Sequence, residues 1–237
     1  MIMKMKQNVK LYVIIAILLV LLAVLNGRQA ASWLIGKILG TSKITYSQRY
    51  RARVSEFKAM NRTQGGIVFL GDSLTDYVNF DDFFPFQIIN RGIAGDTTTG
   101  ILSRLDEVIS LKPGKLFILV GTNDIAYGSS AEKISGNIMK IISRVQENSP
   151  KTKIYLQSLF PTNNKKFSSG RPNSTIQAVN KELEKLAQKL NCEYINLYPL
   201  LLSQDGELDE KFTPDGLHLT QSGMSQWMKF VAPYVNE

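Results

Sequence analysis

The sequence has little of the two side chains that most often build metal and redox sites. Its 237 residues include one cysteine, Cys192, and one histidine, His218. A single cysteine excludes an intramolecular disulfide, a Cys-x-x-Cys redox pair and a cysteine-rich zinc site. A single histidine excludes a metal site built from several histidines. Any chemistry that depends on histidine must therefore use His218.

The main part of the chain also lacks an excess of positive charge, although the whole chain has a formal net charge of +8. Residues 1–66 carry eleven Lys and Arg and one acid, a net of +10, whereas residues 67–237 carry seventeen basic and nineteen acidic side chains, a net of −2. The sequence therefore predicts no nucleic-acid-binding surface on the main domain. With 44% hydrophobic residues the chain can build a core, which excludes a disordered protein.

The one long hydrophobic run lies near the N-terminus. Fifteen apolar residues, Leu11–Leu25, follow lysines at positions 4, 6 and 10. This length suits the core of a signal peptide and is slightly short for a membrane span, and no clean small-x-small cleavage site follows it. We favour an uncleaved signal anchor over residues 1–30, with a cleaved signal peptide as the alternative. The anchor predicts a membrane-attached protein whose main domain lies outside the cytoplasm, and cleavage would make the protein secreted.

Residues 31–63 are predicted to be a basic, helical connector. Apolar and basic residues alternate there at helical spacing, namely Tyr46, Tyr50, Val54 and Phe57 with Arg49, Arg51, Arg53 and Lys58. Two interpretations fit this pattern equally. The segment is either a basic amphipathic helix lying on anionic lipid headgroups or a helix packed on the main domain with its charges in solvent.

The main domain, predicted to span residues 64–237, alternates two kinds of segment. Short apolar runs bounded by Gly, Asp, Asn or Pro are typical of buried strands and occupy residues 66–70, 87–90, 115–120, 153–156 and 194–197. Segments with helical periodicity occupy residues 97–111, 130–148, 173–191 and the chain from about residue 221. Strands that alternate with helices predict an α/β domain with a parallel sheet covered on both faces.

One connection in this domain, residues 161–174, is long for a loop between a strand and a helix. It is polar and basic, and it leaves the carboxyl end of a predicted strand, which is where ligands bind in such folds. It is either a lid over a site or an ordinary surface loop.

Four short segments carry side chains suited to catalysis. Ser73 stands where a strand ends and a helix begins, a place where helix N–H groups stabilise negative charge. Asn123 also follows a strand, and its side-chain amide can donate to an oxyanion. Asp215 precedes His218 by three residues, so it can hold one ring nitrogen and leave the other for a serine. The segments are Gly71-Asp72-Ser73-Leu74, Asn90-Arg91-Gly92-Ile93-Ala94-Gly95-Asp96-Thr97-Thr98, Gly121-Thr122-Asn123-Asp124 and Asp215-Gly216-Leu217-His218.

Each segment alone is typical of a turn or a helix cap, but the four in this order resemble the motifs of the SGNH hydrolases, also called GDSL esterases. The resemblance covers about residues 64–236, and the second segment is similar to that of the platelet-activating-factor acetylhydrolase-like branch. The resemblance implies a flavodoxin-like, three-layer α/β/α sandwich with a five-stranded parallel sheet.

The resemblance also implies a role for each matched residue. Ser73 would be the nucleophile, His218 its general base, and Asp215 the group that orients the imidazole and stabilises its charged form. The oxyanion hole would consist of the backbone N–H groups of Ser73 and Gly95 and the side-chain amide of Asn123, with Gly92 as the alternative glycine. Three carboxylates would brace the loops through hydrogen bonds, namely Asp72, Asp96 and Asp124.

These roles predict a serine esterase that cleaves short acyl or acetyl esters of a small molecule, lipid or glycan through an acyl-serine intermediate. No metal or organic cofactor is needed. Two alternatives remain: acyl transfer to, or deacetylation of, cell-wall glycans through the same acyl-enzyme, and an inactive, membrane-tethered binding module. An inactive module would lack at least one catalytic residue, and none is missing from this sequence.

Overall fold

The computed structural model describes residues 47–60 and 64–237. The hydrophobic run Leu11–Leu25, and with it the predicted anchor, lies outside these residues. Among the helices that are described, none is both long enough and apolar enough to cross a membrane.

Five short strands form one parallel sheet, in the order β2-β1-β3-β4-β5. They are β1 (Ile67–Gly71), β2 (Ile88–Gly92), β3 (Lys115–Leu119), β4 (Lys153–Gln157) and β5 (Glu193–Ile195). All five were predicted from the apolar runs of the sequence, and the α/β fold with a five-stranded parallel sheet is confirmed. Because the strands are parallel, the residues that follow them gather at one edge of the sheet.

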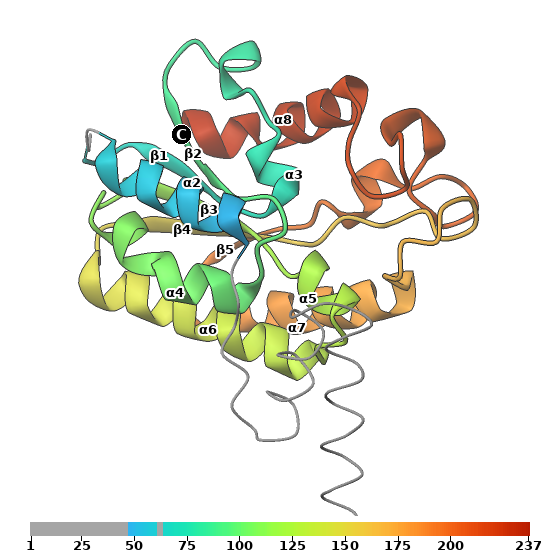
Figure 1. Ribbon diagram of the computed structural model, residues 1–237, viewed down its shortest axis with the longest axis horizontal. Coiled ribbons are helices and arrows are strands. Elements are labelled where there is room, and N and C mark those ends of the chain that lie inside the picture. The colour runs from blue at the N-terminus through green and yellow to red at the C-terminus, as the bar shows by residue number, and fades with distance from the viewer. Residues whose placement is uncertain (1–46, 61–63) are drawn as a thin grey trace, which may run out of the picture. The chain divides into compact units, whose positions relative to one another are not determined.

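Helices cover both faces of the sheet (Figure 1). One face carries α4 (Thr98–Ile109), α6 (Ala131–Asn148) and α7 (Asn173–Lys189), and the other carries α8 (Gln221–Asn236). The side chains of Thr97, Ser130 and Thr220 cap the first turns of α4, α6 and α8 by accepting hydrogen bonds from backbone amides. Shorter elements complete the fold: α3 (Ser73–Asp76), α5 (Thr122–Ala126), η1 (Phe80–Asp82), η2 (Tyr198–Leu201) and η3 (Glu210–Phe212).

A row of aromatic rings crosses the face of the sheet under α8. Phe69, Phe117 and Tyr155 are register partners on β1, β3 and β4, and neighbouring rings stack with their centroids 4.4 Å apart. Trp227 of α8 meets Phe69 and Phe160 edge-on, at 6.4 Å and 5.3 Å between ring centroids. The rings bury a large apolar area on this face and fix α8 against the central strands.

The basic segment before the first strand forms α2 (Gln48–Ala59), which packs beside α4. Phe57 is 1% exposed, the guanidinium of Arg91 lies 4.5 Å from the centre of its ring, and the Tyr50 hydroxyl donates to the carbonyl of Gly100 at 2.7 Å. The apolar side of α2 is therefore covered by protein, as in the second of the two interpretations. Gln48–Glu237 form one compact unit, so α2 belongs to the same unit as the sheet.

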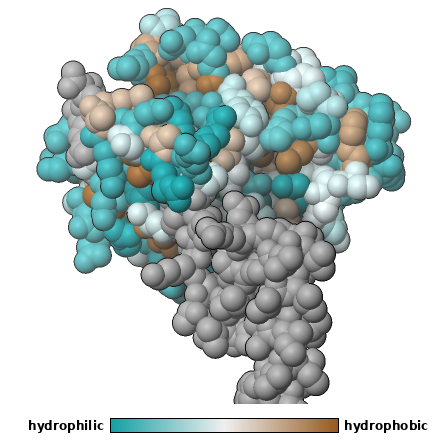
Figure 2. Space-filling view, viewed as in Figure 1, coloured by the Kyte–Doolittle hydropathy of each residue, from teal (hydrophilic) through white to brown (hydrophobic). Residues whose placement is uncertain are grey.

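The face seen in Figure 2 is mostly hydrophilic where it is described, with hydrophobic residues in small, separate groups. Large exposed apolar side chains on the described surface come from distant parts of the chain, namely Met60, Tyr77, Phe86, Tyr127 and Phe230. Such scattered residues are normal for a protein surface.

Candidate active site

A serine, a histidine and an aspartate form a continuous chain at the carboxyl edge of the sheet. Ser73 is the first residue of α3, directly after β1, and its Oγ lies 3.0 Å from Nε2 of His218. Nδ1 of the same imidazole lies 2.6 Å from Oδ2 of Asp215. A carboxylate can only accept a hydrogen bond, so Nδ1 carries the proton and Nε2 is left to accept one from Ser73. The fold thus brings together residues that are 145 positions apart in the sequence.

The turn that carries the imidazole is stabilised by the same carboxylate. Oδ1 of Asp215 accepts hydrogen bonds from the amides of Leu217 and His218 at 3.0 Å and 2.8 Å. Partial burial raises the pKa of Asp215, whereas the hydrogen bonds from the imidazole and these amides lower it. The lowering is larger, so the pKa of Asp215 lies below its usual value. Asp215 is therefore ionised at neutral pH and fixes both the position and the tautomer of His218.

A glycine is required within this turn. Gly216 has a φ of +80°, and a Cβ there would lie 2.7 Å from Phe167 and 2.8 Å from the carbonyl oxygen of Asn163. The loop that contains Phe167 thus approaches the backbone next to His218 more closely than a side chain would allow.

The Ser73 side of the site is built around a buried N-cap. Asp72 is 1% exposed, and its Oδ1 accepts from the amide of Leu74 at 3.0 Å. Burial raises the pKa of Asp72 to about 7, against the lowering effect of this hydrogen bond. Among the described residues, no acceptor pairs with the amide of Ser73 itself.

The two candidate glycine donors differ in their hydrogen bonds. The amide of Gly92 donates to Oδ1 of Asn90 at 2.8 Å and is therefore engaged within the loop. The amide of Gly95 has no acceptor among the described residues, and its φ of +81° turns the chain at this point. Ala94, just before it, donates from its amide to Asp76 of α3 at 2.9 Å. The loop geometry therefore favours Gly95 over Gly92 as a donor to a ligand.

Asn123 lies against the same loop. Its Nδ2 donates to the carbonyl of Asp96 at 2.9 Å, which places this amide beside the residue that follows Gly95. The segments of Ser73, Gly95 and Asn123 leave neighbouring strands, because Gly71 pairs in register with Gly92 on one side and Leu119 on the other. One N–H of the Asn123 side chain remains for a ligand.

The other two carboxylates brace the loops as expected. Asp96 pairs with the buried Arg104 at 2.8 Å and accepts from the amide of Thr97, while Asp124 accepts from the amide and hydroxyl of Thr98. Burial raises the pKa of Asp96 to about 6, although the positive charge of Arg104 lowers it. These contacts hold the start of α4 against the Asn123 segment and leave neither carboxylate free for proton transfer.

Known protein families include one that matches most of this chain. Residues 69–226 match the GDSL-like Lipase/Acylhydrolase family. The chain belongs to this family.

Relatives of this acylhydrolase include the platelet-activating factor acetylhydrolase IB subunit alpha1 of Bos taurus, which is 29% identical over 66% of this chain and 69% of its own length. The alpha2 subunit of Homo sapiens is 29% identical over 69% of this chain and 72% of its own length. A solved GDSL-like lipase from Bacteroides thetaiotaomicron is 26% identical, with a TM-score of 0.69, and covers 79% of this chain and 97% of that one. The family and these relatives identify the chain as an ester-hydrolysing enzyme.

Sequence reasoning missed one residue of the candidate active site. Arg171 donates from Nη2 to Oδ1 of Asn123 at 3.2 Å and from Nε to the carbonyl of Thr122 at 3.1 Å. It belongs to no motif, and a lone arginine in a basic loop gives no signal that it reaches a segment 48 positions away.

The connection predicted at residues 161–174, whose last two residues begin α7, is bound tightly to its surroundings. Thr162 and Asn163 are 0% and 5% exposed, the amide of Asn163 donates to the carbonyl of Gly216 at 2.8 Å, and its side chain donates to the carbonyl of Leu208 at 2.9 Å. These hydrogen bonds are buried and go to backbone carbonyl groups. The first part of the loop, which contains Thr162 and Asn163, is therefore neither a loose surface loop nor a free lid.

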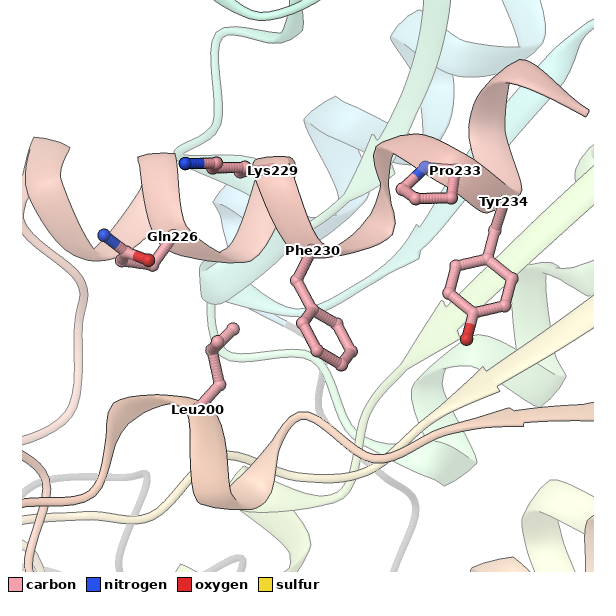
Figure 3. A pocket seen from close by; sticks show the side chains of 6 residues that line it. All are labelled: Leu200, Gln226, Lys229, Phe230, Pro233 and Tyr234. Atoms are coloured by element: carbon pink, nitrogen blue, oxygen red, sulfur yellow. The ribbon is translucent and has the colours of Figure 1, made fainter.

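A separate surface pocket of about 520 Å³ lies between α8 and η2 (Figure 3). Its lining consists of Leu200, Gln226, Lys229, Phe230, Pro233 and Tyr234. None of the candidate catalytic residues lines this pocket.

Proposed function

We propose that this chain hydrolyses short acyl esters, acetyl esters above all, through an acyl intermediate on Ser73. The observation that carries the proposal is the chain of contacts from Ser73 through His218 to Asp215, with 3.0 Å and 2.6 Å between the hydrogen-bonding atoms. The acetyl preference is supported by the relatives, which are named as acetylhydrolases.

The reaction follows from the hydrogen bonds. Nε2 of His218 removes the proton of Ser73 as Oγ forms a bond to the ester carbonyl carbon. The resulting oxyanion accepts from the amides of Ser73 and Gly95 and from Nδ2 of Asn123, and each donor lowers the barrier by about 3 kcal/mol. His218 then protonates the alcohol as the carbon–oxygen bond breaks. Water, activated by the same imidazole, attacks the acyl-serine, and the acid leaves as Ser73 regains its proton.

The nucleophile is tested with Ser73→Ala in the full chain. The variant is expected to lose hydrolysis of p-nitrophenyl acetate and labelling by a serine-reactive phosphonate, with an unchanged circular dichroism spectrum. Ser174→Ala, an exposed serine at the start of α7, is the matched control and should behave like the wild type. Labelling that persists in Ser73→Ala would overturn the assignment.

The acyl preference is tested with p-nitrophenyl esters from acetyl to palmitoyl. We expect kcat/KM to be highest for the acetyl ester and to fall with chain length. A maximum at palmitoyl would refute the short-acyl preference and leave the Ser73 mechanism intact. Adding a glycan acceptor separates hydrolysis from transfer, because a transferase would form an acylated sugar in place of free acid.

We also propose that residues 1–30 attach the enzyme to a membrane, on the evidence of the apolar run Leu11–Leu25 behind three lysines. Full-length protein should then sediment with membranes and require detergent for release, with the catalytic unit open to protease added outside intact cells. Intact full-length protein in the supernatant would contradict the proposal, and a new N-terminus near residue 30 would indicate a cleaved signal peptide.

A further inference from the structure

Each nitrogen of the Arg171 guanidinium donates a hydrogen bond, and two of the three bonds go to the segment of the candidate oxyanion donor. Nε donates to the carbonyl of Thr122 at 3.1 Å, Nη2 to Oδ1 of Asn123 at 3.2 Å, and Nη1 to the carbonyl of Ser169 at 2.6 Å. The first two bonds clamp consecutive residues at the start of α5, and the third returns to the loop that carries Arg171. A planar fork of donors is suited to this task, whereas a lysine ammonium is not.

The backbone of Arg171 is also fixed. Its carbonyl accepts from the hydroxyl of Thr162 at 2.7 Å and from Nδ2 of Asn164 at 3.0 Å, and its amide donates to the hydroxyl of Ser169 at 3.2 Å. The guanidinium therefore extends from an anchored point, so its position does not depend on a mobile loop tip.

The partners of Asn123 determine which way its amide points. On one side stands Arg171, which can only donate, and on the other stands the carbonyl of Asp96, which can only accept. Oδ1 must face Arg171 and Nδ2 must face Asp96, because the flipped amide would place donor against donor and oxygen against oxygen. One N–H of Nδ2 is thereby left without an acceptor among the described residues.

The same loop reaches the other half of the site. The amide of Asn163 donates to the carbonyl of Gly216, two residues before His218, while Arg171 holds Asn123. Residues 161–174 thus connect the turn that carries the general base to the segment that carries the oxyanion donor.

We propose that Arg171 is a positioning residue that fixes the Asn123 amide with its N–H toward the oxyanion, and that loop 161–174 is a brace between the two halves of the site. The inference rests on the proposed role of Asn123. Arg171 does not touch the substrate; it acts through Asn123, so its removal should slow the chemical step and leave substrate binding nearly unchanged.

The test compares Arg171→Met and Arg171→Lys in the full chain with p-nitrophenyl acetate as substrate. Arg171→Met keeps the length of the side chain without its donors, and kcat should fall about tenfold to a hundredfold at nearly constant KM. Arg171→Lys keeps the charge and should recover only part of the loss. Lys166→Gln, an exposed residue of the same loop that pairs with Glu210, is the control and should keep wild-type kcat.

Two further measurements separate positioning from a structural role. In the first, guanidinium ion added to Arg171→Ala should restore part of kcat. In the second, Arg171→Met should have no further effect on kcat in an Asn123→Ala background, because Arg171→Met and Asn123→Ala act on the same oxyanion donor. Wild-type kcat in Arg171→Met, or multiplicative losses in the double variant, would overturn the inference. Wild-type kcat in Asn123→Ala alone would instead overturn the proposed oxyanion donor, and the inference with it. A loss of kcat that follows the loss of folded protein in both Arg171 variants would show a structural role only.

Discussion

The two sides of the candidate site differ in burial and in the range of their contacts. On the imidazole side, the side chains of His218 and Asp215 are 28% and 50% exposed and belong to a single turn. On the oxyanion side, Asp96 and Asp124 are each 3% exposed and bind residues of α4. Proton transfer needs contact with water and the leaving group, whereas an oxyanion hole needs donors that do not move when charge develops. The comparison predicts that changes on the first side affect activity alone and changes on the second also affect stability.

The largest expected effect lies on the imidazole side. His218→Ala removes the general base, and kcat for p-nitrophenyl acetate should fall by about 10⁴-fold. The free energy of unfolding should change by no more than about 0.5 kcal/mol, because the side chain is partly exposed and its hydrogen bonds are confined to Ser73 and Asp215. Denaturant titration and steady-state kinetics on the same preparation measure both. Wild-type turnover in this variant would exclude the serine mechanism, since no second histidine is present in the chain.

The oxyanion side should respond to Asp96→Ala with a loss of stability of about 3 kcal/mol. The side chain of Arg104 is 0% exposed and would lose the carboxylate of Asp96, which lies 2.8 Å away. Only Glu107, at 3.2 Å, would then compensate its buried positive charge. Urea unfolding measures the change. The double variant Asp96→Leu, Arg104→Met is the matched control and should recover much of the stability, because it leaves no unpaired buried charge. A loss that is equal in both variants would contradict this account.

The same contrast explains how much the sequence could predict. The strands, the main helices and the Asp215–His218 turn depend on local patterns: apolar runs, caps and a spacing of three residues. Contacts between distant segments leave no such pattern. Arg171 and Asn123 are 48 positions apart, and the pair of Arg49 in α2 with Asp76 in α3 joins residues 27 positions apart. The periodicity of α2 was visible, but an apolar helix face has the same sequence whether lipid or protein covers it, so its packing on α4 required the structure.

The most gradual expected effect is a dependence of stability on pH that comes from Asp72. Burial raises the pKa of this carboxyl to about 7 in the folded protein, whereas it is near 3.8 in the unfolded chain. Between these values the unfolded chain has released the proton and the folded protein still binds it, so the free energy of unfolding falls as pH rises from about 4 to 7 and levels off above that range.

Asp72→Asn keeps an oxygen to accept from the amide of Leu74 and does not titrate, so it lacks this contribution. Its stability relative to the wild type should therefore increase with pH across the same range. Asp96 titrates in both proteins and enters the difference only through its Coulomb interaction with Asp72. Urea unfolding of the two proteins between about pH 4 and 8 measures the difference. A difference that does not change with pH would mean that Asp72 titrates alike in the folded and unfolded states, and that the oxyanion side is better hydrated than its burial indicates.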